Sequence, residues 1–488
     1  MAPSPARRLG VASVTLMIIA ASAPLTVLAG GVTTTYAVTG LLGVPLSYLV
    51  LGAILAVFAV GYAAMSRHVT NAGAFYAYAA QGISRPVGVG VALVALTAYN
   101  LMQVGIYGVF GFTVSSLLAE RFGLDVPWWA AVLACIAVVA VLGVNRVDLS
   151  ARVLGILVAL EFLVVIVYDI SAFALAPEGI PAEPLSPSSL FVPGVGAVLS
   201  FGVAAFMGFE SAAIYGEEAR NPARTIPRAT FCAVGIIAVF YAVSAWAMSA
   251  GVGTSQLAAV AGEQGPGLVF SFLGGHFGVI AADIAQLLFV TSIFAALVSF
   301  HNAVARYGFS LGRERVLPAW LEATTRHGAP KAGSLVQTGI AVAVTAGFAI
   351  AGTGSELGPL YPVLTLFTWL TNAGAMGLVL LMAVVSLAVV GFFRRRPELA
   401  PGPWAARVAP AVGAVALAVV FALIAANFDL LLGLTEPSPL SWVLPAIVVV
   451  PGVLGILWAL RLRRTAPEVY ARIGHGQEGA AHRLGEEA

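Results

Sequence analysis

Residues 11–38 read VASVTLMIIAASAPLTVLAGGVTTTYAV and contain no charged side chain. A helix of about 20 apolar residues crosses the hydrocarbon core of a bilayer, so this stretch predicts a membrane span. The span is interrupted at Pro24, which lacks a backbone donor and clashes with the preceding turn, and again at Gly30-Gly31. Ala21-Ser-Ala23 resembles the cleavage site of a secretory signal, but the apolar stretch continues past it and favours a retained span.

Similar apolar segments follow along the whole chain. The predicted spans, twelve in all, cover residues 12–39, 44–66, 87–118, 128–145, 151–173, 193–216, 229–251, 277–305, 334–352, 360–391, 407–426 and 439–461. The chain is 60% hydrophobic and 9% charged, whereas a soluble domain is roughly a quarter charged. We therefore predict an all-α integral membrane protein. Cys135 and Cys232 lie inside apolar segments and indicate neither a disulfide nor a metal framework.

The basic residues predict the orientation of the spans. Cytoplasmic loops of membrane proteins carry an excess of Lys and Arg. With the amino terminus inside, 23 of the 24 Lys and Arg residues fall on the inner side, and only Arg121 falls outside. The sequence thus predicts a multi-pass protein of the cell membrane whose terminal residues, 1–11 and 465–488, are both cytoplasmic.

A second interruption occurs in the sixth span, between Gly202 and Glu210. For a single span, a simple kink or close helix packing would explain such a break. Spans one and six correspond, however, if residues 12–173 and 193–391 are two five-span repeats, the second inverted, with 407–461 as two extra spans. Paired broken spans in two repeats indicate the substrate site of a secondary transporter.

Two carboxylates lie at predicted membrane depth, where ionisable groups are costly and usually functional. Glu210 follows the break in span six, so it suits proton coupling or attraction of a substrate ammonium. Its alternative role is to cap backbone N–H groups freed at the break. Glu161 lies in the middle of span five, where it suits proton coupling or, alternatively, packs as a hydrogen-bonded, protonated residue.

Polar and aromatic side chains supply further site candidates. Three polar residues of span three share one helical face and either line a cavity or hold helices together: Asn100, Gln103 and Tyr107. Span eight offers three more on the same terms: Ser292, Ser299 and Asn302. Three aromatic residues are candidate gates, although each alone is as consistent with ordinary packing: Phe206, Phe300 and Trp369.

The sequence lacks the motifs that are typical of several functional classes. The sequence has no phosphate-binding loop, no metal-ligand cluster and no nucleophile elbow, so we expect no cofactor, no metal and no enzymatic activity. No basic stripe suited to nucleic acid occurs. The expected partners are the lipid bilayer, a small amino acid or amine and, as coupling ion, protons.

Three inner-loop motifs resemble those of the amino acid–polyamine–organocation permeases. They are Thr70-Asn-Ala-Gly-Ala-Phe-Tyr-Ala-Tyr78, the run from Phe206-Met-Gly-Phe-Glu-Ser211 to Glu217-Glu-Ala-Arg-Asn-Pro222 and Arg224-Thr-Ile-Pro-Arg228, and Leu311-Gly-Arg-Glu-Arg-Val-Leu-Pro318. The resemblance implies a five-plus-five inverted repeat of the leucine-transporter type with broken spans one and six. It also implies transport by alternating access. The family's substrate site matches the segments Ser22, Ala23, Pro24, Leu25 and Thr26, and Phe206, Met207 and Gly208.

The sequence departs from the family pattern at two points. Ala23-Pro-Leu-Thr26 replaces a Gly-Ser-Gly break, and Glu161 stands where some proton-coupled members carry a lysine. We expect a secondary active transporter of amino acids or related amines, driven by protons. The alternatives are a polyamine or organocation permease or exchanger, and a membrane amino acid sensor that does not transport.

Overall fold

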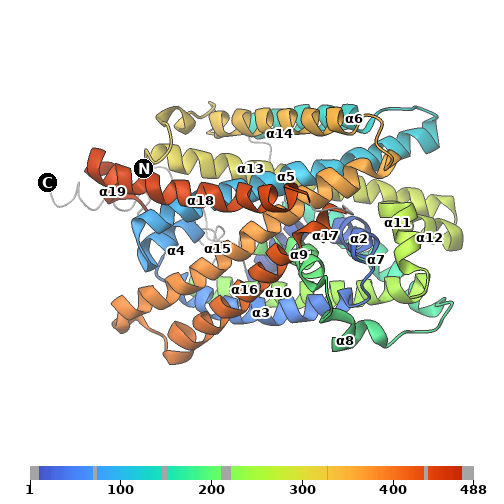
Figure 1. Cartoon of the computed structure of the whole chain (residues 1–488), viewed down its shortest axis with the longest axis horizontal. Coiled ribbons are helices and arrows are strands. Elements are labelled where there is room, and N and C mark those ends of the chain that lie inside the picture. Colours follow the sequence, from blue (N-terminus) through green and yellow to red (C-terminus); the bar gives the residue numbers. More distant parts are fainter. Residues whose placement is uncertain are drawn as a thin grey trace.

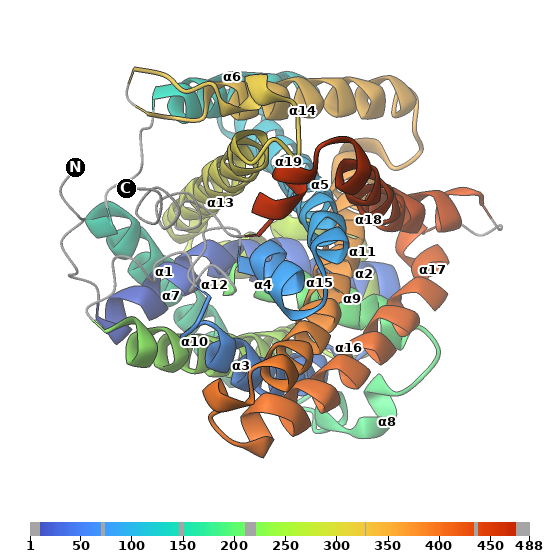
Figure 2. The same cartoon turned by 90° about the vertical axis from the view of Figure 1, so that its left-hand side faces the viewer.

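A computed structural model describes residues 10–69, 74–145, 151–209, 221–326, 328–433 and 438–474. Within these ranges every regular element is a helix. Figures 1 and 2 show long helices running along one direction, with shorter helices at their ends and between them. Glu210 and the following residues to Arg220 lie outside the described residues, so the coupling role predicted for Glu210 stays a prediction.

The principal helices are α1 (Val11–Ser22), α2 (Thr33–Thr39), α3 (Val44–Met65), α4 (Ala74–Gly82), α5 (Arg85–Phe122), α6 (Trp128–Asn145), α7 (Ala151–Ala174), α8 (Pro187–Leu190), α9 (Val195–Phe206), α10 (Pro222–Val252), α11 (Leu257–Gln264), α12 (Leu268–Phe277), α13 (Val279–Arg313), α14 (Lys331–Ala351), α15 (Thr368–Arg395), α16 (Ala409–Ala426), α17 (Phe428–Leu432), α18 (Leu440–Thr465) and α19 (Pro467–Arg472). Three π-helical segments precede α2, α15 and α16: η1 (Thr26–Val32), η7 (Val363–Phe367) and η9 (Trp404–Val408). Short 3₁₀ turns are η2 (Glu183–Leu185), η4 (Gly265–Gly267), η5 (Ala319–Glu322), η6 (Gly358–Leu360) and η8 (Pro397–Leu399).

Ten helices of the described residues are long and apolar enough to cross a membrane. They coincide, within a few residues at most ends, with predicted spans two to five and seven to twelve. The all-helical membrane class is therefore confirmed, with ten candidate spans. The count of twelve, the breaks in spans one and six, the inverted repeat and the cytoplasmic termini stay predictions.

The long helix α5 lies at the centre of the packing. It contacts α13, α15 and α18, while α3 packs against α10 and α16. Helices α6 and α14 lie side by side along the top of Figure 1 and again along the top of Figure 2. Large apolar side chains such as Ile350 and Trp442 point outward, as the surface of a membrane protein requires.

Glycines allow the closest helix contacts, because small residues let backbones approach in membrane proteins. Gly455 of α18 faces Gly90 of α5, and a methyl group at position 455 would lie 2.9 Å from the Gly90 Cα atom. Gly82 at the end of α4 abuts the Ala388 carbonyl of α15 just as tightly. Both contacts fix α5 and α4 against the carboxy-terminal half of the chain.

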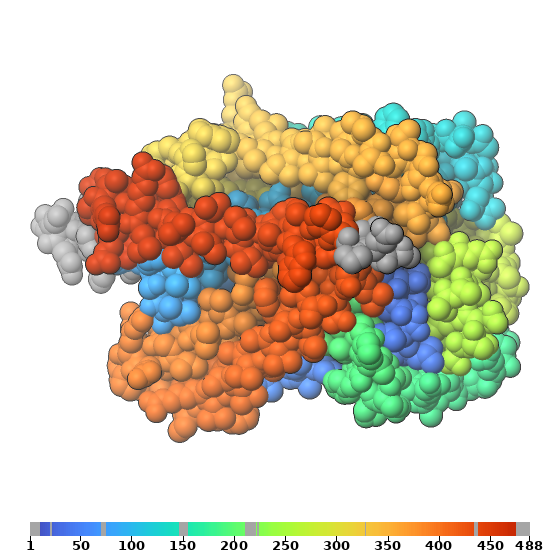
Figure 3. Space-filling view, in the orientation of Figure 1, coloured from blue at the N-terminus to red at the C-terminus, as the bar shows by residue number. Residues whose placement is uncertain are grey.

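Residues 467–474, which we call the carboxy-terminal segment, fold back onto α4 and the end of α13. In Figure 3, α18 and α19 form one band that ends above α4. Ile473 is fully buried, and the Gly474 N–H donates to the Tyr76 hydroxyl oxygen (3.0 Å). The Tyr76 hydroxyl donates in turn to the Glu314 carboxylate, which follows α13. The segment thereby links α4 to the end of α13.

Candidate functional site

Helix α1 is short and ends within the first apolar segment. It stops at Ser22, and Ala23 adopts a left-handed conformation with φ of +50°. A residue other than glycine in that conformation costs of order 1–3 kcal/mol. Pro24 and Leu25 are already helical again, and the chain continues as the π-helix η1 from Thr26. The chain therefore leaves the regular α-helix in the middle of a buried apolar segment.

Glu161 of α7 lies against this break. Its Oε2 atom accepts hydrogen bonds from the Ser292 hydroxyl of α13 (2.7 Å) and from the Leu25 N–H (3.4 Å). The Thr26 hydroxyl donates to the Ser292 oxygen (3.0 Å). Glu161 is 3% exposed, so these hydrogen bonds are buried. One carboxylate thus joins α1, α7 and α13.

The Ser22 side chain holds the end of α1 to α10. Its hydroxyl donates to the Ile19 carbonyl (2.8 Å) and lies 2.9 Å from the Tyr241 hydroxyl. Because the Ser22 proton is already used, Tyr241 is the donor in the second bond. Tyr241 is fully buried and packs its ring 5.6 Å from that of Tyr48.

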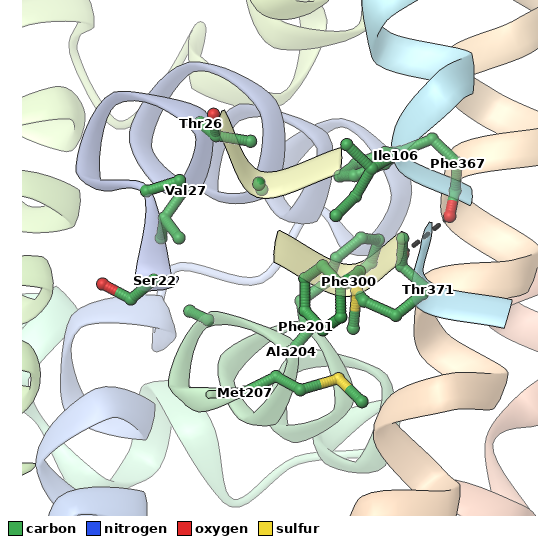
Figure 4. Close-up of a pocket in the computed structure, with 15 residues that line it drawn as sticks. Ser22, Thr26, Val27, Ile106, Phe201, Ala204, Met207, Phe300, Phe367 and Thr371 are labelled. Atoms are coloured by element: carbon green, nitrogen blue, oxygen red, sulfur yellow. Dashed lines mark hydrogen bonds between the residues drawn. The ribbon is translucent and has the colours of Figure 1, made fainter. Parts of the chain in front are cut away.

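A cavity of about 50 Å³ lies beside the break. One wall includes residues of α1, η1 and α9: Ser22, Ala23, Thr26, Val27, Ala204 and Met207. The opposite wall includes residues of α5, α13, η7 and α15: Met102, Ile106, Ala296, Phe300, Phe367 and Thr371. Figure 4 shows Ser22, Thr26 and Val27 across the cavity from Ile106, Phe367 and Thr371. None of the described side chains that line it is charged.

Helix α9 ends at the same cavity. Phe206 is its last residue, Met207 is extended, and Gly208 has φ of +107°. The carbonyl ends of α1 and α9 therefore both lie at the cavity, and each carries partial negative charge. Phe206 itself does not line the cavity and packs beside Tyr48, with ring centroids 6.4 Å apart.

The structure brings some predicted site residues together and places others elsewhere. Ser22, Ala23, Thr26, Met207 and Phe300 line the cavity, and Pro24, Leu25 and Gly208 lie in the adjoining breaks. Asn100 donates to the Leu96 carbonyl of its own helix, and the exposed Ser299 does the same to Ala295. Trp369 packs against Phe348, with ring centroids 5.8 Å apart.

Gln103 belongs to a second polar cluster behind the cavity wall. Its amide contacts His301 of α13 and Gln337 of α14, and His301 also contacts Ser334 (2.7 Å). Met102 and Phe300, the chain neighbours of Gln103 and His301, line the cavity. We call Gln103, His301, Ser334 and Gln337 the rear polar cluster.

Gly30, next to the cavity residue Gly31, packs closely against neighbouring side chains. Gly30 of η1 faces Val109, Phe289 and Phe367, so that a methyl group at position 30 would be 3.6 to 4.0 Å from them. A larger cavity of about 370 Å³ lies between α5, α12 and α13. Arg121, which helps to line this cavity, pairs with Asp283 at 2.6 Å.

Several residues of the cavity carry no chemical signal in the sequence. Met102, Ile106, Phe201 and Phe367 are ordinary apolar residues in apolar segments. Their role depends on which face of each helix turns toward α1, and hydropathy does not reveal that face. Thr371 is polar, but its hydroxyl bonds the Phe367 carbonyl of its own helix (2.6 Å), as threonines in membrane helices commonly do.

Comparison with known proteins gives the family. The sequence profile of the family described as "Amino acid permease" matches residues 9–453. The lysine-specific permease LysP of Lactococcus lactis is 26% identical over 384 residues, which is 74% of this chain and 71% of LysP. The branched-chain amino acid permease BcaP of the same organism is 25% identical over 328 residues, 63% of this chain and 69% of BcaP.

Another relative matches a shorter part of the chain with higher sequence identity. An uncharacterized transporter of Mycobacterium tuberculosis is 34% identical over 145 residues, 29% of this chain and 31% of that protein. The family profile covers most of the chain and agrees with the resemblance of the inner-loop motifs. The chain therefore belongs to the amino acid permease family of the amino acid–polyamine–organocation superfamily, whose members are multi-pass membrane transporters rather than enzymes.

Proposed function

We propose that the chain transports small neutral amino acids across the cell membrane by alternating access and that proton binding at Glu161 couples transport to the pH gradient. The observation that carries this proposal is the position of Glu161. It bonds the backbone at the α1 break and, through Ser292, the helix that forms the opposite cavity wall.

The cavity beside the two helix ends is the proposed substrate site. The carbonyl ends of α1 and α9 suit a substrate ammonium, and the amino-terminal end of η1 at Thr26 suits a carboxylate. Both ends of a zwitterion would thus meet complementary partial charges. This arrangement recognises what all amino acids share, so selectivity would depend on the opposite wall.

The opposite wall favours a small apolar side chain. It is built from Met102, Ile106, Ala296, Phe300 and Phe367, with Thr371 as its polar member. The ammonium group of a lysine or polyamine substrate would lie against this wall. The described lining residues include no carboxylate to pair with it. Burying such a charge unpaired is costly, which argues for neutral substrates.

Glu161 suits coupling because its bonds change when it is protonated. The carboxylate accepts from Ser292 and from the Leu25 N–H. A proton on Glu161 would remove the charge that strengthens these two hydrogen bonds and so weaken the link between α7, α13 and the α1 break. Proton binding would then be tied to the geometry of the substrate site.

The test is uptake of labelled alanine and leucine into proteoliposomes with an imposed pH gradient, inside alkaline, and no sodium. Uptake above that of empty liposomes, abolished by a protonophore, is the expected result. Uptake that needs a sodium gradient and ignores pH would contradict the coupling. Uptake of lysine or spermidine in preference to alanine would contradict the substrate class.

Two alternative functions give different outcomes in the same vesicles. An exchanger would show labelled counterflow without net uptake driven by any ion gradient. A sensor that does not transport would bind amino acid, as a thermal shift, with neither counterflow nor uptake. The rigid link from Glu161 to two cavity walls favours coupled transport over both.

A further inference from the structure

The rear polar cluster is buried between three helices that surround the cavity. Gln103 comes from α5, His301 from α13, and Ser334 and Gln337 from α14. Each is at most 2% exposed. Buried polar groups are expensive in a membrane unless they bond one another, and this cluster is not explained by substrate contact because none of the four lines the cavity.

The hydrogen bonds of the cluster run in one direction. The Gln337 amide donates to Gln103 Oε1, and Gln103 Nε2 donates to His301 Nδ1 (3.4 Å). Because an amide nitrogen only donates, Nδ1 of His301 is an acceptor and the imidazole is neutral, with its hydrogen on Nε2. His301 Nε2 then donates to the Ser334 oxygen at 2.7 Å.

This arrangement leaves one acceptor without a partner. Gln337 Oε1 is fully buried and has no hydrogen bond among the described residues. If a proton binds the lone pair of His301 Nδ1, rotation of both amides presents Gln103 Oε1 to His301 and Gln337 Oε1 to Gln103 Nε2. The cluster keeps three hydrogen bonds, and the formerly unpaired oxygen gains a donor. A proton therefore enters without loss of a bond in the chain.

The surroundings of His301 hold no counter-charge in the described part of the chain. From α6, Gly143 lies so close that a methyl group there would be 2.6 Å from the imidazole ring. The titratable groups nearest to the cluster are the Tyr107 hydroxyl of α5, beside the Gln103 amide, and Cys135 of α6, beside Tyr107; both are uncharged near neutral pH. Lys331 and Arg306, on α14 and α13, are exposed.

A charged His301 would thus be costly in the closed packing and favoured wherever water reaches it. Protonation would therefore favour a different arrangement of α13 against α5 and α14. Phe300 and Met102, next to His301 and Gln103 in the chain, would move with these helices and alter the cavity wall. This gives a physical route from a proton on the cluster to the substrate site.

We propose that His301 is a second proton-binding residue of the transport cycle and that Gln103 and Gln337 form a reversible amide relay that reorients when His301 takes up its proton. The inference rests on the proposed proton-coupled transport and adds a proton to that of Glu161. The only bond that forms is N–H at Nδ1, and the proton comes from water on the side to which the cluster opens.

The experiment compares the wild type with His301→Gln and, as matched control, His276→Gln, whose side chain is exposed on α12. Proteoliposomes with the membrane potential clamped at zero are given a pH gradient, and the maximal accumulation of alanine is measured. Each coupled proton contributes about tenfold accumulation per pH unit. We expect His301→Gln to lose about tenfold per pH unit and His276→Gln to match the wild type.

A second variant keeps the imidazole. Gln103→Glu replaces the amide by a carboxylate of the same shape, which would hold the proton on His301 to higher pH. Its uptake is expected to persist to more alkaline pH than that of the wild type. An unchanged gradient dependence in His301→Gln, or an unmoved alkaline limb in Gln103→Glu, would overturn the proposal. A wild type insensitive to the pH gradient would instead overturn the proposed function itself.

Should His301→Gln fail to fold, Gln103→Glu and the wild type still decide the question. Nitrogen-15 NMR of labelled histidine in wild-type nanodiscs identifies the neutral Nε2–H tautomer and follows its conversion to the cation with pH. A buried histidine signal that never gains the second proton, in any substrate or pH condition under which transport runs, would contradict the second proton site.

Discussion

The Ser292 hydroxyl donates a 2.7 Å hydrogen bond to the Glu161 carboxylate at the point where helix α1 ends. Ser292 accepts in turn from Thr26, whose side chain lines the cavity. The carboxylate is therefore one hydroxyl away from a cavity residue while remaining out of the cavity itself. In the proposed mechanism, a substrate in the cavity would sense the protonation state of Glu161 through Thr26 and Ser292 without touching it.

Glu161→Gln is expected to abolish the contribution of this proton while the fold is retained, because the amide oxygen can still accept from Ser292. Accumulation of alanine should fall by about tenfold per pH unit of imposed gradient, whereas labelled counterflow should continue. Both are measured in the same proteoliposomes.

The matched control is Asp169→Asn. Asp169 lies on the same helix, is similarly buried and accepts from Ser244 at 2.8 Å, but none of its hydrogen bonds reaches the α1 break. Gradient-driven accumulation in this variant should equal that of the wild type. Equal losses in both variants would show that any buried carboxyl of α7 matters and would remove the special role of Glu161.

The sequence predicted most of the fold, because a membrane span is read from length and hydropathy alone. Ten of the predicted spans appear as helices among the described residues. The spacing of Asn100, Gln103 and Tyr107 also predicted one shared face of α5.

The sequence does not reveal which neighbouring helices the shared polar face of α5 contacts. Gln103 turns toward His301 and Gln337 rather than into the cavity, and Met102, with no polar atom to suggest a role, lines the cavity instead. A rotation of α5 by one residue decides between the two. Only the packing of α13, α14 and α15 around α5 sets that rotation.

Ile106→Ala is expected to change selectivity. Ile106 lines the cavity wall opposite the α1 break, so its truncation should make room for a longer substrate side chain. Differences of this size in an apolar pocket correspond to about 1–3 kcal/mol. The ratio of leucine to alanine uptake should therefore rise at least about tenfold, measured as competition between the two labelled substrates.

Leu101→Ala is the control for this change, since Leu101 lies on the same helix but does not line the cavity. Its selectivity should stay that of the wild type. A rise in the leucine ratio for Leu101→Ala as large as for Ile106→Ala would mean that loosening α5, rather than enlarging the cavity, changes the preference.

Gly82→Ala should destabilise the protein through the contact between α4 and α15. A methyl group at position 82 would overlap the Ala388 carbonyl, and overpacking of this kind costs about 1–3 kcal/mol. The melting temperature in detergent should fall. Gly235→Ala, at an exposed position of α10 with open space around it, should be neutral or stabilising, because alanine favours helix by up to about 1 kcal/mol.

Gly474→Ala tests the docking of the carboxy-terminal segment. Gly474 has φ of +80°, and a methyl group there would lie 2.5 Å from the Ala80 Cβ atom. The variant should lower the melting temperature through both strain and overlap. Adding Ala80→Gly removes the overlap and leaves the strain, so the double variant should recover part of the loss. No recovery would mean that the segment is not held against α4.

Ionisation of Tyr76 should make the contact between the carboxy-terminal segment and α4 depend on pH. Burial, together with the adjacent Glu314 carboxylate, raises the pKa of Tyr76 well above its usual range. A raised pKa means that the folded state favours the protonated phenol, so the docking is fully present below the unfolded pKa of about 10. It is lost progressively as the pH rises above that value.

The measurement is the melting temperature in detergent between pH 8 and pH 11, in the wild type and in Tyr76→Phe. The phenylalanine variant lacks the ionisable group but leaves Glu314 and the Gly474 N–H without this partner, at a cost of about 1–3 kcal/mol. It should therefore melt lower at pH 8 and lose less stability on going to pH 11. Other buried tyrosines contribute equally to both curves, so only the difference between them reports on Tyr76. Parallel curves would contradict the assignment of this alkaline transition to the contact between Tyr76 and Glu314.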